Sequence, residues 1–429
     1  MRYLLVALLL LLSVLVAPAQ AETRAPVVFV HGQQGSAQQW QSNAKRFSSN
    51  GYPNALLYAY EYDTSVPTND AAVAGLEAYL ADVRASTGSS TVDVIAHSRG
   101  TTVMHAFLAD PVRAAQVRRY VNVDGRSSAT PPGGVATLAL WGSLQPNGSI
   151  GGATNVYLTT LGHTETTTSA VGFGHIYQFL RDRPAVTTRV LPELSATVGI
   201  AGRAVLFPQN TGVAGLLQVW EVDPRTGARR GAPRYSVRIG ADGGFGPLAV
   251  RQGTHYELVL LRAGEQTYHN YFEPFERGDR FLRLPVSPPG GIGDQVDKCP
   301  THTALTVTRN REWWGDQTDN DRLRLNGVDV LTPTVSPRLR QILAAFVFDD
   351  GCDLTSTSAV PAPFGALPFL TASDTYLPAS PTAAGTIAIT QTARGTNGAT
   401  RTVAVRNWPS NAHTVAVQFK DYVDQRPAA

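Results

Sequence analysis

Charged residues are scarce in this chain, and neither sign dominates. Of its 429 residues, 16% are Asp, Glu, Lys or Arg, and the formal net charge is +3. Nucleic-acid binding relies on Lys and Arg gathered on one face, and the sequence has no such run, which excludes that class of partner. Hydrophobic residues make up 43% of the chain, too many for a disordered protein. We expect two or three hydrophobic cores, because a single core stops growing at about 250–300 residues.

Cysteine is scarcer still, with Cys299 and Cys352 alone in the whole sequence. In an exported protein such a pair is expected to form a disulfide, which here would close a loop of about 54 residues. Two buried free thiols are the alternative. The spacing does not match a zinc site, and no metal ligand set is predicted.

Long apolar runs are also lacking, apart from one at the N-terminus. Arg2 precedes an apolar stretch over Leu4–Val16, and the small residues of Ala19–Ala21 follow it, as in a signal peptide. The stretch is shorter than the roughly 20 residues of a membrane-spanning helix. We therefore predict a signal peptide over residues 1–21, a secreted or periplasmic mature chain, and no transmembrane anchor after cleavage. An uncleaved anchor is the alternative.

Residues 25–185 alternate apolar runs with helical patterns, which is typical of βα units and a parallel sheet. This region is predicted to be an α/β catalytic domain with a doubly wound, mostly parallel sheet. Strands are expected over Val27–Val30, Ala55–Tyr60, Val92–Ala96, Tyr120–Val123, Thr137–Trp141 and Asn155–Leu158. Helices are expected over Gln38–Ser49, from a cap at Asp70 to Val83, over Thr101–Ala109 and over Ala170–Arg181.

From about residue 190 onward, short alternating strands are separated by clusters of Gly, Pro, Asn and Asp. This pattern predicts a β-rich region, either a sandwich or a barrel. Expected strands are Leu216–Val222, Tyr235–Ile239, Tyr256–Leu261, Thr386–Thr390 and Thr414–Phe419. Pro and Gly over residues 287–291 predict a division into a β-sandwich-like module at 190–286 and a second β-rich module at 292–429.

One amphipathic helix is expected within the β-rich region, because Ser336 and Pro337 form a start signal before the apolar stripe of Leu339–Phe348. This helix and the apolar stretch Ala362–Leu370 are expected to fill a core. The alternative is that either covers an active site or touches a lipid surface.

No cofactor is predicted. Two acidic groups lack the Gly and Glu positions of an EF-hand calcium loop, and we interpret them as solvated loop charges. Calcium binding stays open as the alternative. The two groups are Asp316, Asp319 and Asp321, and Asp349, Asp350 and Asp353.

The clearest catalytic pattern is a buried strand that runs into small-x-Ser-x-Gly and then into a helix. Ser98 is the serine, between Ala96, where Gly is usual, and Gly100. On such a sharp turn the hydroxyl is exposed at the end of the sheet, and small neighbours let the backbones meet. Ser98 is therefore predicted to be a nucleophile; a plain loop serine is the alternative.

A second pattern lies where the first strand ends in His-Gly-Gln-Gln-Gly, at residues 31–35. In hydrolases with a serine on a strand-to-helix turn, this loop and the residue after the nucleophile supply the oxyanion-hole N–H groups. We assign those donors to the backbone of Gln33 and of Arg99. A strand-end turn with no role is the alternative.

Together, the motifs at residues 31–35 and 96–100 resemble those of α/β-hydrolase lipases, and more closely the class 2 bacterial lipases and the two-domain prokaryotic lipases with a β-rich C-terminal part. The resemblance covers residues 26–183; for the C-terminal half it is one of layout. It implies the α/β-hydrolase fold, with triacylglycerols or related esters as substrates.

The general base is expected late in the α/β domain, because the triad of this fold runs in the order Ser, acid, His. His163 follows the last predicted strand and is the candidate, with His175 in the closing helix as the alternative. His31 and His97 belong to the two motifs, where they are expected to pack or hydrogen-bond, and His105 lies mid-helix.

The acid is assigned to Asp124, which directly follows Tyr120–Val123, because functional groups of an open parallel sheet gather at the carboxyl ends of its strands. In this fold the acid more often follows the next strand, but Thr137–Trp141 leads into residues without a carboxylate. Glu165, read as a solvated loop charge, is the alternative.

These assignments predict a secreted serine carboxylester hydrolase of the lipase type. It would cleave triacylglycerol or other fatty-acyl esters through an acyl-enzyme on Ser98. A short-chain esterase or polyester depolymerase with the same triad is the alternative, and an amidase or peptidase shares the chemistry. A ligand-binding or adhesion protein with a vestigial hydrolase domain is the alternative from another class.

Overall fold

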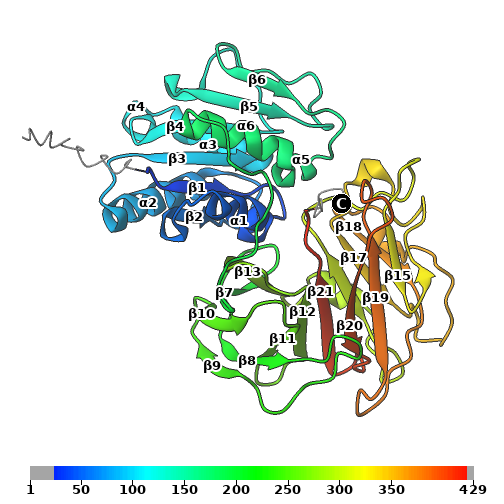
Figure 1. Cartoon of the computed structure of the whole chain (residues 1–429). Helices are drawn as coiled ribbons and strands as arrows, with labels where there is room; N and C mark the ends of the chain where they lie inside the picture. Colours follow the sequence, from blue (N-terminus) through cyan, green and yellow to red (C-terminus); the bar gives the residue numbers. More distant parts are fainter. Residues whose placement is uncertain (1–23, 423–429) are drawn as a thin grey trace, which may run out of the picture.

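The computed structural model describes residues 24–422, so the predicted signal peptide at residues 1–21 lies outside the described residues. The N-terminal domain is built on a six-stranded sheet of order β2-β1-β3-β4-β5-β6, in which all neighbours are parallel (Figure 1). Its strands are β1 (Val27–Val30), β2 (Leu57–Tyr60), β3 (Val92–His97), β4 (Val117–Val123), β5 (Thr137–Trp141) and β6 (Thr154–Tyr157). The predicted α/β fold is confirmed.

Helices cover both faces of this sheet, and the apolar residues of β1 show why. Val28 and Val30 pack with α2 and α3, whereas Val27 and Phe29 pack with α1 and α6. A strand buried on both faces is apolar throughout, as the sequence indicated. The helices are α1 (Gln41–Ser49), α2 (Asp70–Thr87), α3 (Arg99–Leu108), α4 (Pro111–Ala114), α5 (Glu165–Thr168) and α6 (Ala170–Arg181).

The predicted cap of α2 is wrong by one residue. Asn69 precedes the helix and makes no side-chain capping bond, while Asp70 is the first helical residue. The Asn69 side chain is engaged elsewhere, because its Oδ1 accepts a hydrogen bond from Nε of Arg99 at 2.9 Å.

The region after residue 190 is β-rich, as predicted, and forms three sheets of three, eight and four strands. They are β10-β7-β13, β18-β17-β14-β21-β12-β11-β8-β9 and β16-β15-β19-β20. The bounds are β7 (Thr197–Leu206), β8 (Gly215–Glu221), β9 (Tyr235–Ile239), β10 (Gly244–Arg251), β11 (Tyr256–Leu261), β12 (Thr267–Phe272), β13 (Asp279–Val286), β14 (Leu305–Thr308), β15 (Arg322–Leu325), β16 (Val328–Asp329), β17 (Ala344–Phe348), β18 (Leu370–Asp374), β19 (Thr386–Thr392), β20 (Thr400–Arg406) and β21 (His413–Gln418).

The eight-stranded sheet combines strands from both sides of the Pro- and Gly-rich stretch at residues 287–291. The last strand, β21, pairs in parallel with β12 on one side and with β14 on the other. The two segments that the sequence separates therefore share one continuous sheet.

The amphipathic helix predicted over Leu339–Phe348 is wrong. Residues Arg338–Arg340 form a short 3-10 turn, Gln341 takes a left-handed conformation, and Ala344–Phe348 is the strand β17. A short apolar run does not by itself distinguish a helix from a buried strand. The segment Ala344–Phe348 is a strand because it pairs with β14 on one side and with β18 on the other.

The second apolar stretch fills a core, as expected. Phe364, in a 3-10 turn over Ala362–Phe364, is fully buried against Phe348 and Ala372. The C-terminal end of this stretch also reaches the domain interface, where Phe369 and Leu370 line a cavity that faces the α/β domain.

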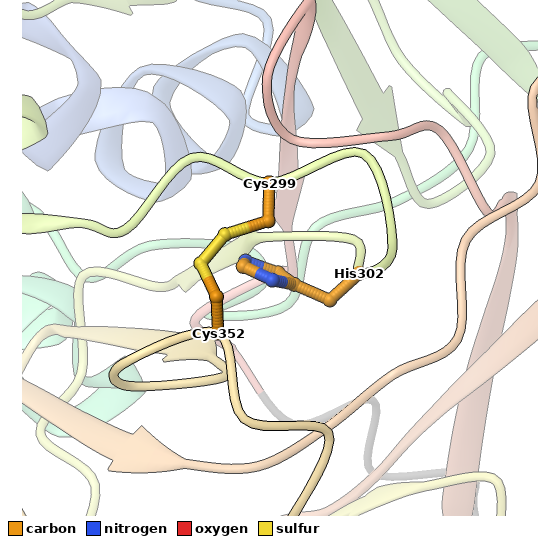
Figure 2. A group of neighbouring side chains, drawn as sticks. All are labelled: Cys299, His302 and Cys352. Carbon is orange, nitrogen blue, oxygen red and sulfur yellow. A yellow bond between two sulfur atoms is a disulfide. The ribbon is translucent and has the colours of Figure 1, made fainter.

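The predicted disulfide is confirmed: Cys299 and Cys352 are bonded, with their Cα atoms 6.3 Å apart (Figure 2). His302 lies beside the bridge, and its Nε2 is 3.0 Å from Oγ of Ser410. Within residues 24–422, Cys299, Cys352 and His302 form the cluster whose potential ligand atoms lie close enough together to hold a metal ion. Because the two sulfurs are bonded to each other, the group is a disulfide beside a buried histidine.

The interpretation of the acidic groups as solvated charges is wrong for two of their members. Asp321 and Asp349 are buried, at 2% and 0% exposure. Asp321 forms ion pairs with Arg309 and Arg394, and Asp349 accepts hydrogen bonds from the backbone N–H groups of residues 353 and 354. A buried carboxylate is stable when such partners replace its water.

The β-rich region packs on the α/β domain through β13 (Figure 1). Phe281 of β13 joins the core on the α1 side of the parallel sheet and meets Phe29 edge-on, with ring centroids 6.0 Å apart. Arg283 of β13 pairs with the buried Glu61 at 2.7 Å. In the described part of the chain, no helix is long and apolar enough to span a membrane.

Candidate active site

Ser98 lies on a sharp turn between β3 and α3, as predicted. Its backbone has φ 51° and ψ −123°, a strained conformation for a residue with a side chain. Its N–H donates to the Val123 carbonyl of β4 at 3.0 Å. A Cβ on Gly100 would lie 2.5 Å from the carbonyl oxygen of His31, so glycine is required there. The half-buried side chain of Ser98 lines a cavity of about 120 Å³.

Asp124 follows β4 at the same end of the sheet and is 1% exposed. Its Oδ1 accepts hydrogen bonds from the backbone N–H groups of Gly142, at 2.7 Å, and Gln145, at 3.2 Å. A Cβ on Gly142 would come within 2.9 Å of Asp124 Oδ2. The loop after β5 therefore supplies no carboxylate and instead holds the one that follows β4.

His163 is brought to Asp124 by the loop between β6 and α5. Its Nδ1 lies 2.7 Å from Oδ2 of Asp124, and both side chains are buried. Because the carboxylate accepts the Nδ1–H, the other ring nitrogen, Nε2, is left to accept a proton. His163 and Ser98 line the same cavity, and Asp124 contacts the His163 ring, so the predicted nucleophile, base and acid lie at one end of the sheet. His175 lies within α6 and is not among the residues that line it.

His97 holds the loop that carries His163. Its Nε2 lies 3.1 Å from the His163 carbonyl oxygen, and its Nδ1 lies 2.5 Å from the Gln39 amide nitrogen. Burial and the neighbouring His163 lower the pKa of His97 well below its ordinary value. His97 is therefore a neutral donor to the His163 carbonyl. The sequence placed His97 in the motif but gave no signal for Gln39.

The loop at residues 31–35 lies directly against the serine. A Cβ on Gly32 would be 2.9 Å from Cβ of Ser98. The side chains of the two predicted donors are joined, since an Arg99 guanidinium N–H donates to Oε1 of Gln33 at 2.7 Å. Arg99 also donates to backbone carbonyls of residues 64, 66 and 68. These bonds tie the Arg99 side chain to the loop at residues 31–35 and to residues 64–68.

Asn210, from the β-rich region, is a contact that the sequence did not reveal. Its amide donates to the carbonyl of Gly35 at 2.9 Å and to that of Tyr62 at 3.1 Å. His31, at the base of the same loop, stacks on Tyr62 and is fully buried, and this burial lowers the pKa of His31 to about 4.

Glu165 is not a solvated charge, and that interpretation is wrong. It is 7% exposed and pairs with Arg311 and Arg394 of the β-rich region. Burial alone raises the pKa of this carboxyl, but the two arginines outweigh burial and hold the pKa below its ordinary value. Its carboxylate faces the arginines, whereas the His163 ring faces Asp124.

The Ser98 cavity shares lining residues with a larger one. The second cavity, of about 320 Å³, lies over the eight-stranded sheet. Phe207, Pro285, Ala344 and Leu370 line both. Arg283 and Thr308 of the β-rich region line both cavities as well, so the shared lining is partly apolar and partly polar.

Comparison with known families gives three matches along the chain. Residues 24–109 match the class 2 lipase family, residues 196–289 match the lipase C-terminal domain, and residues 291–423 match a further C-terminal domain. The resemblance to class 2 lipases is confirmed. The family supports an ester hydrolase of the lipase type. The class 2 match includes the loop at residues 31–35 and Ser98, and ends before Asp124 and His163.

Solved structures similar to this chain come from several organisms. A gene product of Listeria innocua is 12% identical over 38% of this chain and 97% of its own, with a TM-score of 0.30. Aspergillus fumigatus lipase B is 14% identical over 38% and 54%, with a TM-score of 0.30. A Bacillus licheniformis lipase in its propeptide form is 12% identical over 89% and 93%, with a TM-score of 0.29.

Proposed function

We propose that this lipase-type hydrolase cleaves fatty-acyl esters through a covalent acyl-enzyme on Ser98. The observation that carries the proposal is that Ser98 and His163 line one cavity while Asp124 holds the far nitrogen of the His163 ring. In this mechanism His163 accepts the Ser98 proton as Oγ attacks the ester carbonyl. Asp124 fixes the ring tautomer and stabilises the imidazolium that forms.

The carbonyl oxygen becomes negative in the tetrahedral intermediate, where the backbone N–H groups of Gln33 and Arg99 are proposed to bind it. Such donors typically contribute about 2.7–4 kcal/mol to transition-state stabilisation. His163 then returns the proton to the leaving alcohol. A water, activated by His163, releases the fatty acid and regenerates Ser98.

A fatty-acyl substrate is favoured over a short-chain one by the cavity of about 320 Å³ that shares lining residues with the Ser98 cavity. That volume is in the range of about 300–1,000 Å³ in which proteins enclose small ligands. Phe207, Pro285 and Leu370 offer apolar surface to both cavities. Export to an oxidising compartment is part of the proposal, supported by the Cys299–Cys352 disulfide.

The test is hydrolysis of emulsified triolein and of tributyrin by purified protein, with and without a chelator. We expect fatty-acid release from both, and turnover lower by about 10⁶-fold in Ser98→Ala, by analogy with a serine protease. Activity on tributyrin alone would favour the short-chain esterase. No activity in either assay, with no labelling by a fluorophosphonate, would favour the vestigial domain.

A further inference from the structure

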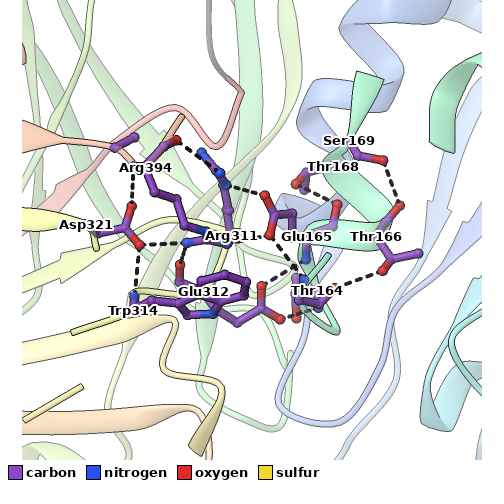
Figure 3. Close-up of polar contacts among 12 residues, drawn as sticks. Thr164, Glu165, Thr166, Thr168, Ser169, Arg311, Glu312, Trp314, Asp321 and Arg394 are labelled. Atoms are coloured by element: carbon purple, nitrogen blue, oxygen red, sulfur yellow. Dashed lines mark hydrogen bonds and ion pairs between the residues drawn. The ribbon is translucent and has the colours of Figure 1, made fainter. Parts of the chain in front are cut away.

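The loop that carries His163 is held from two sides. In the α/β domain, His97 contacts the His163 carbonyl at 3.1 Å and the Asn43 amide donates to the Thr167 carbonyl at 2.6 Å. From the β-rich region, Glu312 accepts hydrogen bonds from the backbone N–H groups of Thr164 and Glu165, the second at 3.0 Å (Figure 3). The residues directly after His163 are thus anchored on a side chain that is distant in sequence.

Glu312 also fits the loop sterically. It is fully buried, and a Cβ on Gly162 would lie 2.3 Å from its Oε2. Any side chain at position 162 would displace either the carboxylate or the loop. The glycine before His163 is therefore required by a carboxylate of the other domain.

Arginines of the β-rich region extend this contact (Figure 3). Nε of Arg311 lies 2.7 Å from Oε1 of Glu165, and Arg394 bonds the other oxygen. Arg394 is itself held by Asp321 at 2.6 Å. The Glu165 carboxylate accepts the Gly162 N–H at 3.1 Å. The network is buried, and in such surroundings polar contacts hold their geometry firmly because no water competes for them.

We propose that Glu312, Arg311 and Arg394 are positioning residues that fix the His163 loop, so that the β-rich region completes the active site. None of the three is among the residues that line the Ser98 cavity, and they act through His163 and not on the substrate. The inference rests on the proposed function, because it takes His163 as the general base. Its consequence is that catalytic rate depends on the second domain even for esters too short to contact it.

The test measures kcat and KM on a soluble short-chain nitrophenyl ester, together with the rate at which a fluorophosphonate labels Ser98, in full-length variants. For Glu312→Ala we expect kcat and the labelling rate to fall by about 10- to 100-fold, because small displacements of a base are costly, with KM unchanged. Glu312→Gln keeps the side-chain shape and one acceptor oxygen, so its kcat should lie between that of the wild type and that of Glu312→Ala.

Asp279→Asn is the matched control. Asp279 is a buried carboxylate that also joins the two domains, through Lys45 at 2.6 Å and the Gln41 amide at 3.0 Å, but it does not touch the His163 loop. Its loss should lower the melting temperature and leave kcat unchanged. If Glu312→Ala does not fold, the Gln variant decides. Wild-type kcat and labelling in the Glu312 variants would overturn the inference alone, whereas failure of the wild type to be labelled would overturn the proposed function with it.

Discussion

Asp124, which directly follows β4, holds His163 through a single contact of 2.7 Å between Oδ2 and Nδ1. The other carboxylate oxygen is saturated by backbone N–H groups of the loop after β5. This arrangement fixes both the Asp124 carboxylate and the His163 ring. The role of each residue can therefore be tested by substituting it alone.

Replacement of Asp124 by Asn should leave the fold intact and disable the base. An amide at this position no longer selects the ring tautomer with hydrogen on Nδ1, and by analogy with serine proteases kcat should fall by about 10⁴-fold. The measurement is steady-state hydrolysis of a soluble nitrophenyl ester, with circular dichroism as the check on folding. Wild-type turnover in a folded Asp124→Asn protein would remove Asp124 from the mechanism.

Stability is expected to fall on mild acidification because of His31. Its pKa is about 4 in the folded protein against an ordinary 6.5, so between these pH values the unfolded chain binds more protons. The contribution, of about 3 kcal/mol at most, is present above pH 6.5 and is lost as the pH falls toward 4. Asp93, whose pKa burial raises to about 6, opposes this trend.

The check is thermal unfolding of wild type and of His31→Gln from pH 7 to pH 4.5. The wild type should lose stability over this range, and the variant should lose less. Equal slopes for the two proteins would show that His31 does not titrate as its burial requires.

The disulfide should stabilise the β-rich region without acting in catalysis. Cys299 and Cys352 are 53 residues apart in sequence, for which the chain-entropy model gives about 4 kcal/mol. The double variant Cys299→Ser/Cys352→Ser should therefore unfold at lower denaturant concentration. Its kcat at 25 °C should match the wild type wherever it is folded, and a selective loss of activity in the folded double variant would contradict this.

A bulky residue at a position that lines both cavities should discriminate by acyl length. Ala344 is 8% exposed and lines both cavities. Ala344→Phe should lower kcat/KM on a palmitoyl ester about tenfold or more, since each buried methylene contributes about 0.8 kcal/mol, and should spare a butyryl ester. Leu339→Trp, at a site that is 93% exposed, is the control. Equal losses on both esters would contradict an acyl chain that extends from the Ser98 cavity past residue 344.

Local sequence patterns predicted the α/β domain closely, because residues close together in the sequence indicate each of its strands and helices. A strand buried on both faces is apolar throughout, and β1, β5 and α6 have the predicted bounds. The turn at Ser98 and the disulfide follow from residue types at fixed places. The positions of Asp124 after β4 and of His163 after β6 followed from the strand pattern, and their catalytic roles stay predictions.

The remainder depends on contacts that sequence spacing does not encode. The segment Ala344–Phe348 became a strand because partners on both sides complete its hydrogen bonds. Glu165 and Asp321 are charged residues whose arginine partners lie up to 229 residues away in sequence. A buried ion pair looks like two surface charges until the fold brings its members together.

The most direct test of the central claim is peptide mapping by mass spectrometry after treatment with a fluorophosphonate. We expect one adduct on Ser98 in the wild type, formed rapidly at neutral pH, and slow labelling or none in folded His163→Ala. An adduct on another serine, or equal labelling of Ser98 with and without His163, would contradict a nucleophile activated by this pair.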